Sequence, residues 1–290
     1  MKKFISILLI MGLLSTMCGA LAISSGEKRA VIGADISDAD VTDVYKAFGV
    51  ERKSVTELKV TNADERKYLQ GSVDEALLGT HSISCVYIET LEAGKGLDVT
   101  TSNINWCKPE MYVGALATAG VTDAKVIVAA PFEVSGTAAL TGVYMAYEDI
   151  TGEKLDETAK LISTQELSVT AELADEIGSY DSVEIVNELK LILDETKILT
   201  DAELKAKILE IGKEYNVTLK DAQLDKLVGL CRQLEKLNSD ALKEKVESVK
   251  QTIENMAEAK TKVTGFFASV KEVVSSIGEF FQRIFAGFKK

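Results

Sequence analysis

Apolar runs alternate with amphipathic segments over the first half of the chain. The runs favour strands, and they cover residues 29–35, 56–61, 82–91, 97–102 and 124–131. Segments of helical periodicity follow four of them, and these begin near Ser37, Asn62, Pro109 and Gly136. The order β-α-β-α-β-β-α-β-α predicts an α/β domain over residues 23–152, with helices packed on a mixed sheet.

Two local signals refine this pattern. Glycines at 94 and 96 separate the third and fourth runs and predict that these two strands form a hairpin. Asn62 and Glu65 have the spacing of a capping box, in which the N-cap side chain and the residue three places on bond each other's backbone. We therefore expect a helix to begin at Asn62.

Strand signals stop near residue 153, and leucine and isoleucine then recur every three or four positions. The helices that this pattern predicts cover residues 155–178, 181–197, 200–215 and 218–237. Three of them open with capping-box spacings: Asp181 with Glu184, Thr200 with Glu203, and Thr218 with Asp221. Residues 153–238 are therefore predicted to form a helical bundle that packs on the sheet domain.

Residues 239–290 contain no proline and keep one apolar stripe from Leu242 to Phe288 in a near-heptad pattern. A single helix of this length would extend about 75 Å, and Gly265 or Gly278 could break it. Residues 260–290 carry six basic and two acidic side chains. The face predicted to dock to a membrane surface, a partner helix or a second copy consists of Phe266, Phe267, Val270, Val274, Ile277, Phe280, Phe281, Ile284, Phe285 and Phe288.

The first 22 residues have the pattern of a secretory signal peptide. Lys2 and Lys3 precede an apolar stretch, Phe4 to Leu14, that is too short to span a bilayer, and a small-residue cleavage site follows at residues 20–22. Met17 stands where a lipid-attachment signal before Cys18 would place a small residue. We therefore expect a cleaved, exported protein that is secreted or extracellular, with residence at the cell envelope as an option.

Cleavage of this signal peptide would remove Lys2 and Lys3. The remaining chain would carry 31 of the 33 basic residues against 45 acidic ones, a net charge of −14. Such a chain has no general attraction for nucleic acid. Its three remaining cysteines allow at most one internal bridge, and Cys85 with Cys107 is the plausible pair. Three unpaired thiols are the alternative, and Cys231 lies on the apolar stripe of a helix.

Three stretches are similar to one known family: "GADIS", "VTNADERKYLQG" and "NINWCKPEMYVGALATAGVTDAKVIVAAPFEVSGTAALTG". They resemble the domain of unknown function 1002 family, exported proteins of Gram-positive Firmicutes. The resemblance covers nearly the whole chain after the signal peptide and is strongest from Asn103 to Gly142. It implies export and an envelope or extracellular setting, and it implies no activity.

The residues restrict the chemistry that is available. His81 is the only histidine, so a Ser-His-Asp or Cys-His mechanism would have to use it as the base. Ser135 lacks the G-x-S-x-G elbow of serine hydrolases. On a strand, His81 and Cys85 would lie about 13 Å apart, too far for two ligands of one metal ion. We predict no metal and no cofactor.

One loop is the best candidate for a binding site. Ser135, Gly136 and Thr137 lie where an apolar strand passes into a helix, and the free N–H groups there suit an anion. If the first and last strands are parallel neighbours, Asp35 and Glu133 gather at the same edge. In the alternative reading Ser135 and Asp35 are ordinary caps. Trp106 is either an exposed platform or a plug in the core.

These features predict a secreted, non-enzymatic, envelope-associated protein whose C-terminal helix docks to a membrane, a partner or itself. The alternative function is a binding domain for a small anionic ligand or a cell-wall polymer at the edge near Asp35 and Ser135. A hydrolase is the third interpretation. An exposed Phe266–Phe288 face would favour the first, and a concave pocket at Thr137 the second.

Overall fold

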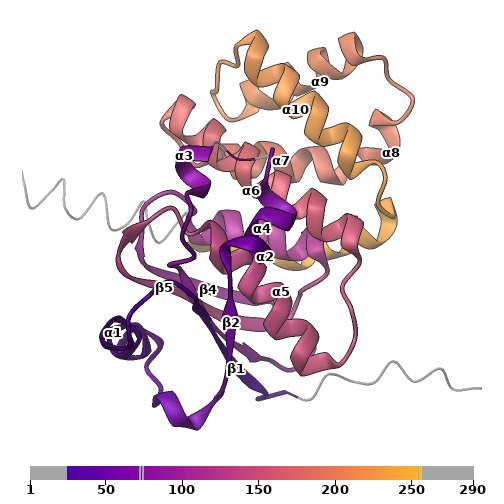
Figure 1. The fold of residues 1–290 in the computed structure, drawn as a ribbon. Coiled ribbons are helices and arrows are strands. Elements are labelled where there is room, and N and C mark those ends of the chain that lie inside the picture. The colour runs from indigo at the N-terminus through magenta and orange to yellow at the C-terminus, as the bar shows by residue number, and fades with distance from the viewer. Residues whose placement is uncertain (1–24, 72, 74, 254, 257–290) are drawn as a thin grey trace, which may run out of the picture.

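The computed structural model describes residues 25–71, 73, 75–253, 255 and 256. At its centre lies a five-stranded mixed sheet in the order β2-β1-β3-β5-β4 (Figure 1). The strands are β1 (Lys28–Gly33), β2 (Thr56–Val60), β3 (Cys85–Thr90), β4 (Leu97–Ile104) and β5 (Ala124–Val134). The predicted mixed sheet with packed helices is therefore confirmed.

The predicted hairpin between the third and fourth strands is wrong, because β5 lies between β3 and β4. β5 pairs antiparallel with β3 and parallel with β4. Val126 and Val128 of β5 are fully buried, so an interior position in the sheet suits this strand and gives its backbone partners on both sides. β4 alternates buried and exposed residues along its first half and lies at the edge.

β5 also continues past the proline at which the sequence predicts its end. Pro131 lies in a gap of the ladder, between the pairs Ser102 with Ala129 and Ile104 with Val134. A proline is tolerated there because no ladder hydrogen bond requires its missing N–H. The strand therefore reaches Val134 and delivers the following loop to the edge of the sheet.

Helices cover both faces of the sheet. Helix α1 (Asp38–Phe48), capped by Ser37 as predicted, packs on one face, and its apolar cluster is the smallest among the described residues. In Figure 1 it lies on the opposite side of the sheet from α2, α4 and α5. The other elements before residue 152 are a 3-10 helix (Arg52–Ser54), α2 (Asn62–Leu69), α3 (Glu75–Leu78), α4 (Pro109–Ala119) and α5 (Thr137–Thr151).

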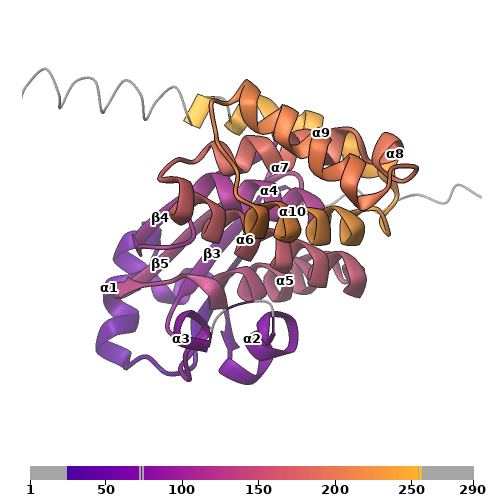
Figure 2. The same cartoon turned by 90° about the horizontal axis from the view of Figure 1, so that it is seen from above.

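A helical region follows and has its own apolar cluster. It consists of α6 (Glu157–Ile177), α7 (Asp181–Leu191), α8 (Leu193–Thr196), α9 (Asp201–Glu214) and α10 (Asp221–Leu234). Helix α6 contributes Leu167 to the sheet's cluster and Leu173 to that of the helical region. Figure 2 shows α9 and α10 outside α6, on the side far from α1.

Residues 239–253 are helical and return across both clusters. Leu242 and Val246 belong to the cluster of the helical region, whereas Val249 and Ile253 belong to that of the sheet. The beginning of the predicted amphipathic helix thus packs its stripe on the protein's own core. The predicted docking face, Phe266 to Phe288, lies outside the described residues.

Of the four predicted capping boxes, the structure confirms one. The box of Thr200 and Glu203 is present at α9. At α2 the box is formed by Thr61 and Asp64, because Thr61 keeps the extended backbone of an N-cap and Asn62 is already helical. Asp181 likewise lies inside α7, and Lys220, not Thr218, precedes α10. The spacing locates a helix start to within one or two residues and does not select the cap.

A buried ion pair joins the helical region to the sheet domain. Lys190 Nζ on α7 lies 2.8 Å from Glu166 Oε1 on α6, and both side chains are almost inaccessible to solvent. The ammonium also donates to the Gly114 carbonyl of α4 (3.3 Å). Thr118 of α4 donates to the other oxygen of Glu166 (2.6 Å). One buried charge pair therefore contacts all three helices.

The bridge considered for Cys85 and Cys107 is absent. Both are free, buried thiols that belong to apolar clusters on opposite faces of the sheet, and Cys231 is also free and buried. Burial raises the pKa of the Cys85 and Cys107 thiols to about 12 and that of Cys231 to about 11. The alternative of three unpaired thiols therefore holds for these residues.

Candidate functional site

A cavity of about 460 Å³ opens where the loop after β5 meets α2 and α3. Its polar lining consists of Glu65, Thr80, His81, Ser84, Asn105, Ser135 and Thr137, and its apolar lining includes Leu77, Leu78, Ile83 and Val134. The loop that the sequence selects, Ser135 to Thr137, thus forms one wall. A volume of this size is typical of pockets for small molecules.

Gly136 shapes the loop. It is the N-cap of α5 and has a φ of 95°, a left-handed conformation that strains any residue with a side chain. Its carbonyl accepts a hydrogen bond from the Tyr112 hydroxyl (2.5 Å). A Cβ atom at this position would lie 2.6 Å from Ile104 Cγ2 and 2.6 Å from the Tyr112 hydroxyl oxygen. Glycine therefore allows both the turn and the close packing beneath it.

Glu65 and Thr137 form the buried end of the cavity. The Thr137 hydroxyl donates to Glu65 Oε1 at 2.5 Å, and the two residues are 1% and 3% exposed. Burial raises the pKa of the Glu65 carboxyl to about 7, although the Thr137 and Asn62 hydrogen bonds and the Arg66 charge oppose the rise. The carboxyl group therefore changes its charge near neutral pH.

Among the described residues, no general base accepts a hydrogen bond from Ser135. Its hydroxyl donates to the Leu77 carbonyl (3.0 Å) and lies 3.3 Å from Thr137 Oγ1. His81 Nδ1 lies 2.9 Å from the Thr80 hydroxyl, and the described residues show no hydrogen bond between His81 and Ser135. The cavity therefore brings a serine, a histidine and a carboxyl group together without the relay that a serine hydrolase requires.

Arg66 supports the outer wall. Its guanidinium makes two hydrogen bonds to Glu75 (3.1 and 2.8 Å) and one to the Gly79 carbonyl (2.8 Å). These contacts hold α3 and the turn after it against α2. Among the residues that the structure describes, neither lysine nor arginine lines the cavity. A bound anion would thus meet no permanently charged cation there.

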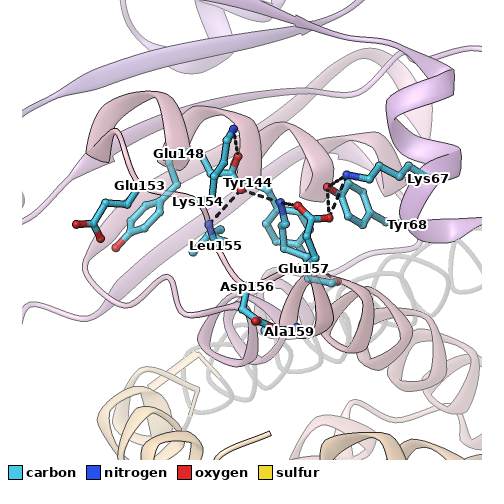
Figure 3. Close-up of polar contacts among 12 residues, drawn as sticks. Lys67, Tyr68, Tyr144, Glu148, Glu153, Lys154, Leu155, Asp156, Glu157 and Ala159 are labelled. Atoms are coloured by element: carbon cyan, nitrogen blue, oxygen red, sulfur yellow. Dashed lines mark hydrogen bonds and ion pairs between the residues drawn. The ribbon is translucent and has the colours of Figure 1, made fainter. Parts of the chain in front are cut away.

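A second polar cluster anchors the helix that carries Glu65 (Figure 3). Lys160, which is 2% exposed, lies 2.7 Å from Glu148 Oε1 and 2.6 Å from Glu157 Oε1. Glu157 also pairs with Lys67 of α2 (3.0 Å) and accepts the Tyr68 hydroxyl (3.2 Å). The Lys160 and Lys67 hydrogen bonds hold the pKa of Glu157 down at about 2. The cluster joins α2 to α5 and α6, less than one turn after Glu65.

The structure separates the remaining predicted site residues from the cavity. Asp35 is exposed and accepts the Ser82 N–H (2.7 Å), because β3 lies between β1 and β5 and the first and last strands are not neighbours. Glu133 is exposed on β5 and does not line the cavity. Trp106 is a core residue, 7% exposed, whose indole N–H donates to Asp175 (2.9 Å).

The polar lining residues that the sequence pattern does not select for a binding site are Glu65, Thr80, His81, Ser84 and Asn105. In the sequence, Glu65 has the spacing of a capping-box partner for Asn62, and this local signal gives no indication of its contact with Thr137. His81 stands out as the single histidine, but nothing local places it beside Ser135. Asn105 has no distinguishing signal.

We expect Glu65→Gln to remove a pH dependence of stability. The folded-state pKa of about 7 lies above the ordinary 4.5, so the folded protein binds the proton more tightly than the unfolded chain. The stability that Glu65 contributes at low pH is therefore lost as the pH rises from about 4.5 to about 7. At pH 8 the variant should exceed the natural protein in unfolding free energy by roughly 3 kcal/mol.

Urea unfolding followed by circular dichroism at about pH 4.5 and 8 measures this difference. Glu51→Gln, which removes an exposed carboxyl group, is the matched control for the loss of one negative charge. Equal gains for the two variants at pH 8 would show that the net charge of the chain, and not the burial of Glu65, causes the effect.

Two further classes of site can be assessed over the described residues. No group of three or more His, Cys, Asp or Glu side chains there could hold a metal ion. Within the same part of the chain, none of the helices combines the length and the apolar character that crossing a bilayer requires.

Comparison with known proteins gives a family match and one curated relative. The model of the family described as "Protein of unknown function (DUF1002)" matches residues 32–256, a range that contains every residue of the cavity. The uncharacterized protein YpuA of Bacillus subtilis (strain 168) is 35% identical over 261 residues, which covers 87% of this chain and 90% of that protein. No solved structure matches significantly.

Proposed function

The chain belongs to the DUF1002 family, whose description assigns no activity, and from the geometry of the cavity we propose that it is a binding protein for a small, neutral, hydroxyl-bearing ligand. The ligand class is that of a sugar unit, as in a cell-wall polymer. The observation that carries the proposal is the buried Glu65–Thr137 pair at the end of a cavity that has no lysine or arginine in its described lining.

Charge decides between a neutral ligand and an anion. The amino end of α5 favours an anion by about 0.3–1 kcal/mol, and by about 2 kcal/mol at most. An ionised Glu65 would repel an anion 5 Å away by about 3 kcal/mol at an effective dielectric constant near 20. The repulsion exceeds the attraction whenever Glu65 is ionised. A neutral hydroxyl group, in contrast, can donate to the carboxylate, and such charge-assisted bonds contribute about 1.5–3 kcal/mol.

The rest of the lining suits a sugar. Hydroxyl groups of Ser135 and Thr137 and the amide of Asn105 can donate to or accept from ligand hydroxyl groups. Leu77 and Ile83, which are partly buried, offer apolar surface to the C–H face of a ring. Because Ser135 bonds to no general base in the described part of the chain, the same lining supports binding and gives no support to hydrolysis.

We propose an exported, envelope-associated setting for this binding. Its support is sequence alone: the basic start at Lys2 and Lys3, the apolar stretch to Leu14, and the small residues at 20–22. Docking of residues 260–290 to a membrane, a partner helix or a second copy is part of the same proposal and rests on their basic, phenylalanine-rich pattern. N-terminal sequencing of protein from the culture medium and the cell envelope tests the export.

Calorimetric titration with the trimer of N-acetylglucosamine and with sulfate tests the ligand class. We expect the affinity for the sugar to rise by at least threefold between about pH 5.5 and 8, because the ionised Glu65 is the better acceptor. Sulfate, whose charge is constant over this range, should bind more weakly as the pH rises. Thr137→Val should reduce sugar affinity about tenfold, since it removes a buried hydroxyl group.

Thr137→Ser, which keeps the hydroxyl group, is the matched control and should bind the sugar nearly as well as the natural protein. His81→Ala checks that the pH dependence comes from Glu65, because it removes the other titratable group in the lining. If sulfate still bound at pH 8 and the sugar did not bind, the proposal of a neutral ligand would be wrong and an anion would be the ligand class.

A further inference from the structure

A second cavity, of about 370 Å³, lies between the start of α6 and the helical residues 239–253. Its lining includes Asp156, Thr158, Lys236, Asn238 and Lys245. It shares no residue with the first cavity. The sheet domain supplies one wall through Thr118 of α4, and the segment after α10 supplies the opposite wall.

Lys245 is the unusual residue of this cavity. It is partly buried, and no hydrogen bond or ion pair links its ammonium to any described residue. The charge lies over the end of α4, where a Cβ atom on Gly120 would be 3.2 Å from Nζ. It also lines a neighbouring cavity of about 330 Å³ with Asp123 and Glu244. Burial lowers the pKa of Lys245, which indicates that its charge lacks full compensation.

The acidic groups near Lys245 are occupied or lie in the open. The Asp156 carboxylate caps α6 by accepting the Ala159 N–H (2.8 Å). Asp123 accepts the Gly96 N–H (2.8 Å), and Glu244 is exposed to solvent. Although the chain has an excess of acidic residues, none of these three pairs with Lys245. Among the described residues, Glu244 attracts the ammonium without an ion pair, and none of these carboxylates is a paired counter-ion.

The remaining lining is rich in donors. Asn238 Oδ1 accepts the Ala241 N–H (2.9 Å), which leaves its NH₂ group available to a ligand. Lys236 reaches Gln233 Oε1 at 2.5 Å and retains two further N–H donors. Two helices begin at the cavity, α6 and residues 239–253, and their first N–H groups have no intrahelical acceptor. Two ammonium groups, of Lys236 and Lys245, face the single carboxylate of Asp156 in this lining, so the set matches an oxyanion with several acceptor oxygens.

We propose that this cavity binds a phosphate group, held by Lys245 and Lys236 between the sheet domain and the segment after α10. The phosphate is either free or carried by a small organic molecule. This site is independent of the sugar site proposed above, because the two share no residue and rely on different groups. A bound phosphate would stabilise the contact of residues 239–253 with α4 and α6.

Titration of the full chain after residue 22 with inorganic phosphate and with glycerol phosphate, at about pH 7.5, tests the proposal. Lys245→Met should lower phosphate affinity at least tenfold. Lys243→Met changes net charge equally on the same helix, but Lys243 is exposed and lines neither cavity, so less than a twofold effect is expected. Thr137→Val should leave phosphate binding unchanged, which separates this site from the first cavity. Stronger binding of glycerol phosphate than of inorganic phosphate identifies an organic phosphate as the ligand, and the reverse identifies the free ion.

Lys236→Gln is a second variant, at an exposed residue that has no role in the core. We expect it to lower the affinity for phosphate threefold or more. Thermal unfolding of each variant without phosphate checks that the fold is intact. Equal losses for Lys245→Met and Lys243→Met, or no saturable binding at millimolar phosphate, overturn the proposal.

Discussion

Replacement of Lys190 with methionine is expected to lower the free energy of unfolding by about 3–5 kcal/mol, because it leaves the Glu166 carboxylate buried without its cation. Lys190 and Glu166 are 2.8 Å apart, and neither reaches solvent. The remaining donor to Glu166, the Thr118 hydroxyl, carries no charge that could compensate for the carboxylate. Urea unfolding followed by circular dichroism measures the loss.

The double variant Lys190→Met/Glu166→Leu is the informative control. With both charges gone, no ion remains to be desolvated, and apolar replacements of a buried pair are often neutral or stabilising. We therefore expect the double variant to recover most of the stability that the single variant loses. A double variant as unstable as Lys190→Met alone would show that the geometry of the three helices, and not the unpaired charge, accounts for the loss.

Replacement of Gly136 with alanine should cost about 2–5 kcal/mol and abolish ligand binding in the first cavity. The left-handed backbone at a φ of 95° accounts for about 1–2 kcal/mol of this loss. Crowding adds about 1–3 kcal/mol, because the new Cβ would lie 2.6 Å from both Ile104 and Tyr112. The loop can relieve the contact only by moving Ser135 and Thr137, which line the cavity.

Gly152→Ala separates these two contributions. Gly152 also has a left-handed backbone, with a φ of 70°, but a Cβ atom added there would have no neighbouring atom within 4 Å. Its replacement should therefore cost about 1–2 kcal/mol from the backbone alone and leave binding intact. Similar losses for the two variants, with the sugar affinity preserved in both, would contradict the role given to the packing beneath Gly136.

The periodicity of the sequence predicts the elements better than their pairing. All five strands and helices α1, α2, α4 and α5 follow from local apolar patterns, with errors of a few residues at their ends. The short α3 and the 3-10 helix were not predicted, and the helix predicted over residues 181–197 is divided into α7 and α8. The insertion of β5 between β3 and β4 could not be predicted, because short loops favour a hairpin locally and the competing pairing is set by burial across the whole sheet. The end of β5 was predicted too early, at Pro131, for the same reason. Whether a strand can contain a proline depends on its hydrogen bonds to the partner strand.

The residues of the first cavity divide in the same way into those with a local signal in the sequence and those without one. Ser135, Gly136 and Thr137 were predictable because the passage from a strand to a helix has a local signature. Glu65 was not, because its side chain acts on a residue 72 positions away, and its sequence neighbours suggest only a cap. Lys190 resembles any surface lysine of an amphipathic helix, and its burial follows from the packing of three helices.

The helical residues 239–253 also determine when the protein can reach its native state during synthesis. Val249 and Ile253 complete the core of the sheet, and Leu242 and Val246 complete that of the helical region. A nascent chain that has not yet passed residue 253 therefore lacks apolar side chains that both cores require. Under the export proposed above, machinery that threads unfolded polypeptides would meet this chain before its two apolar clusters are complete, and the late position of these side chains would favour translocation ahead of folding.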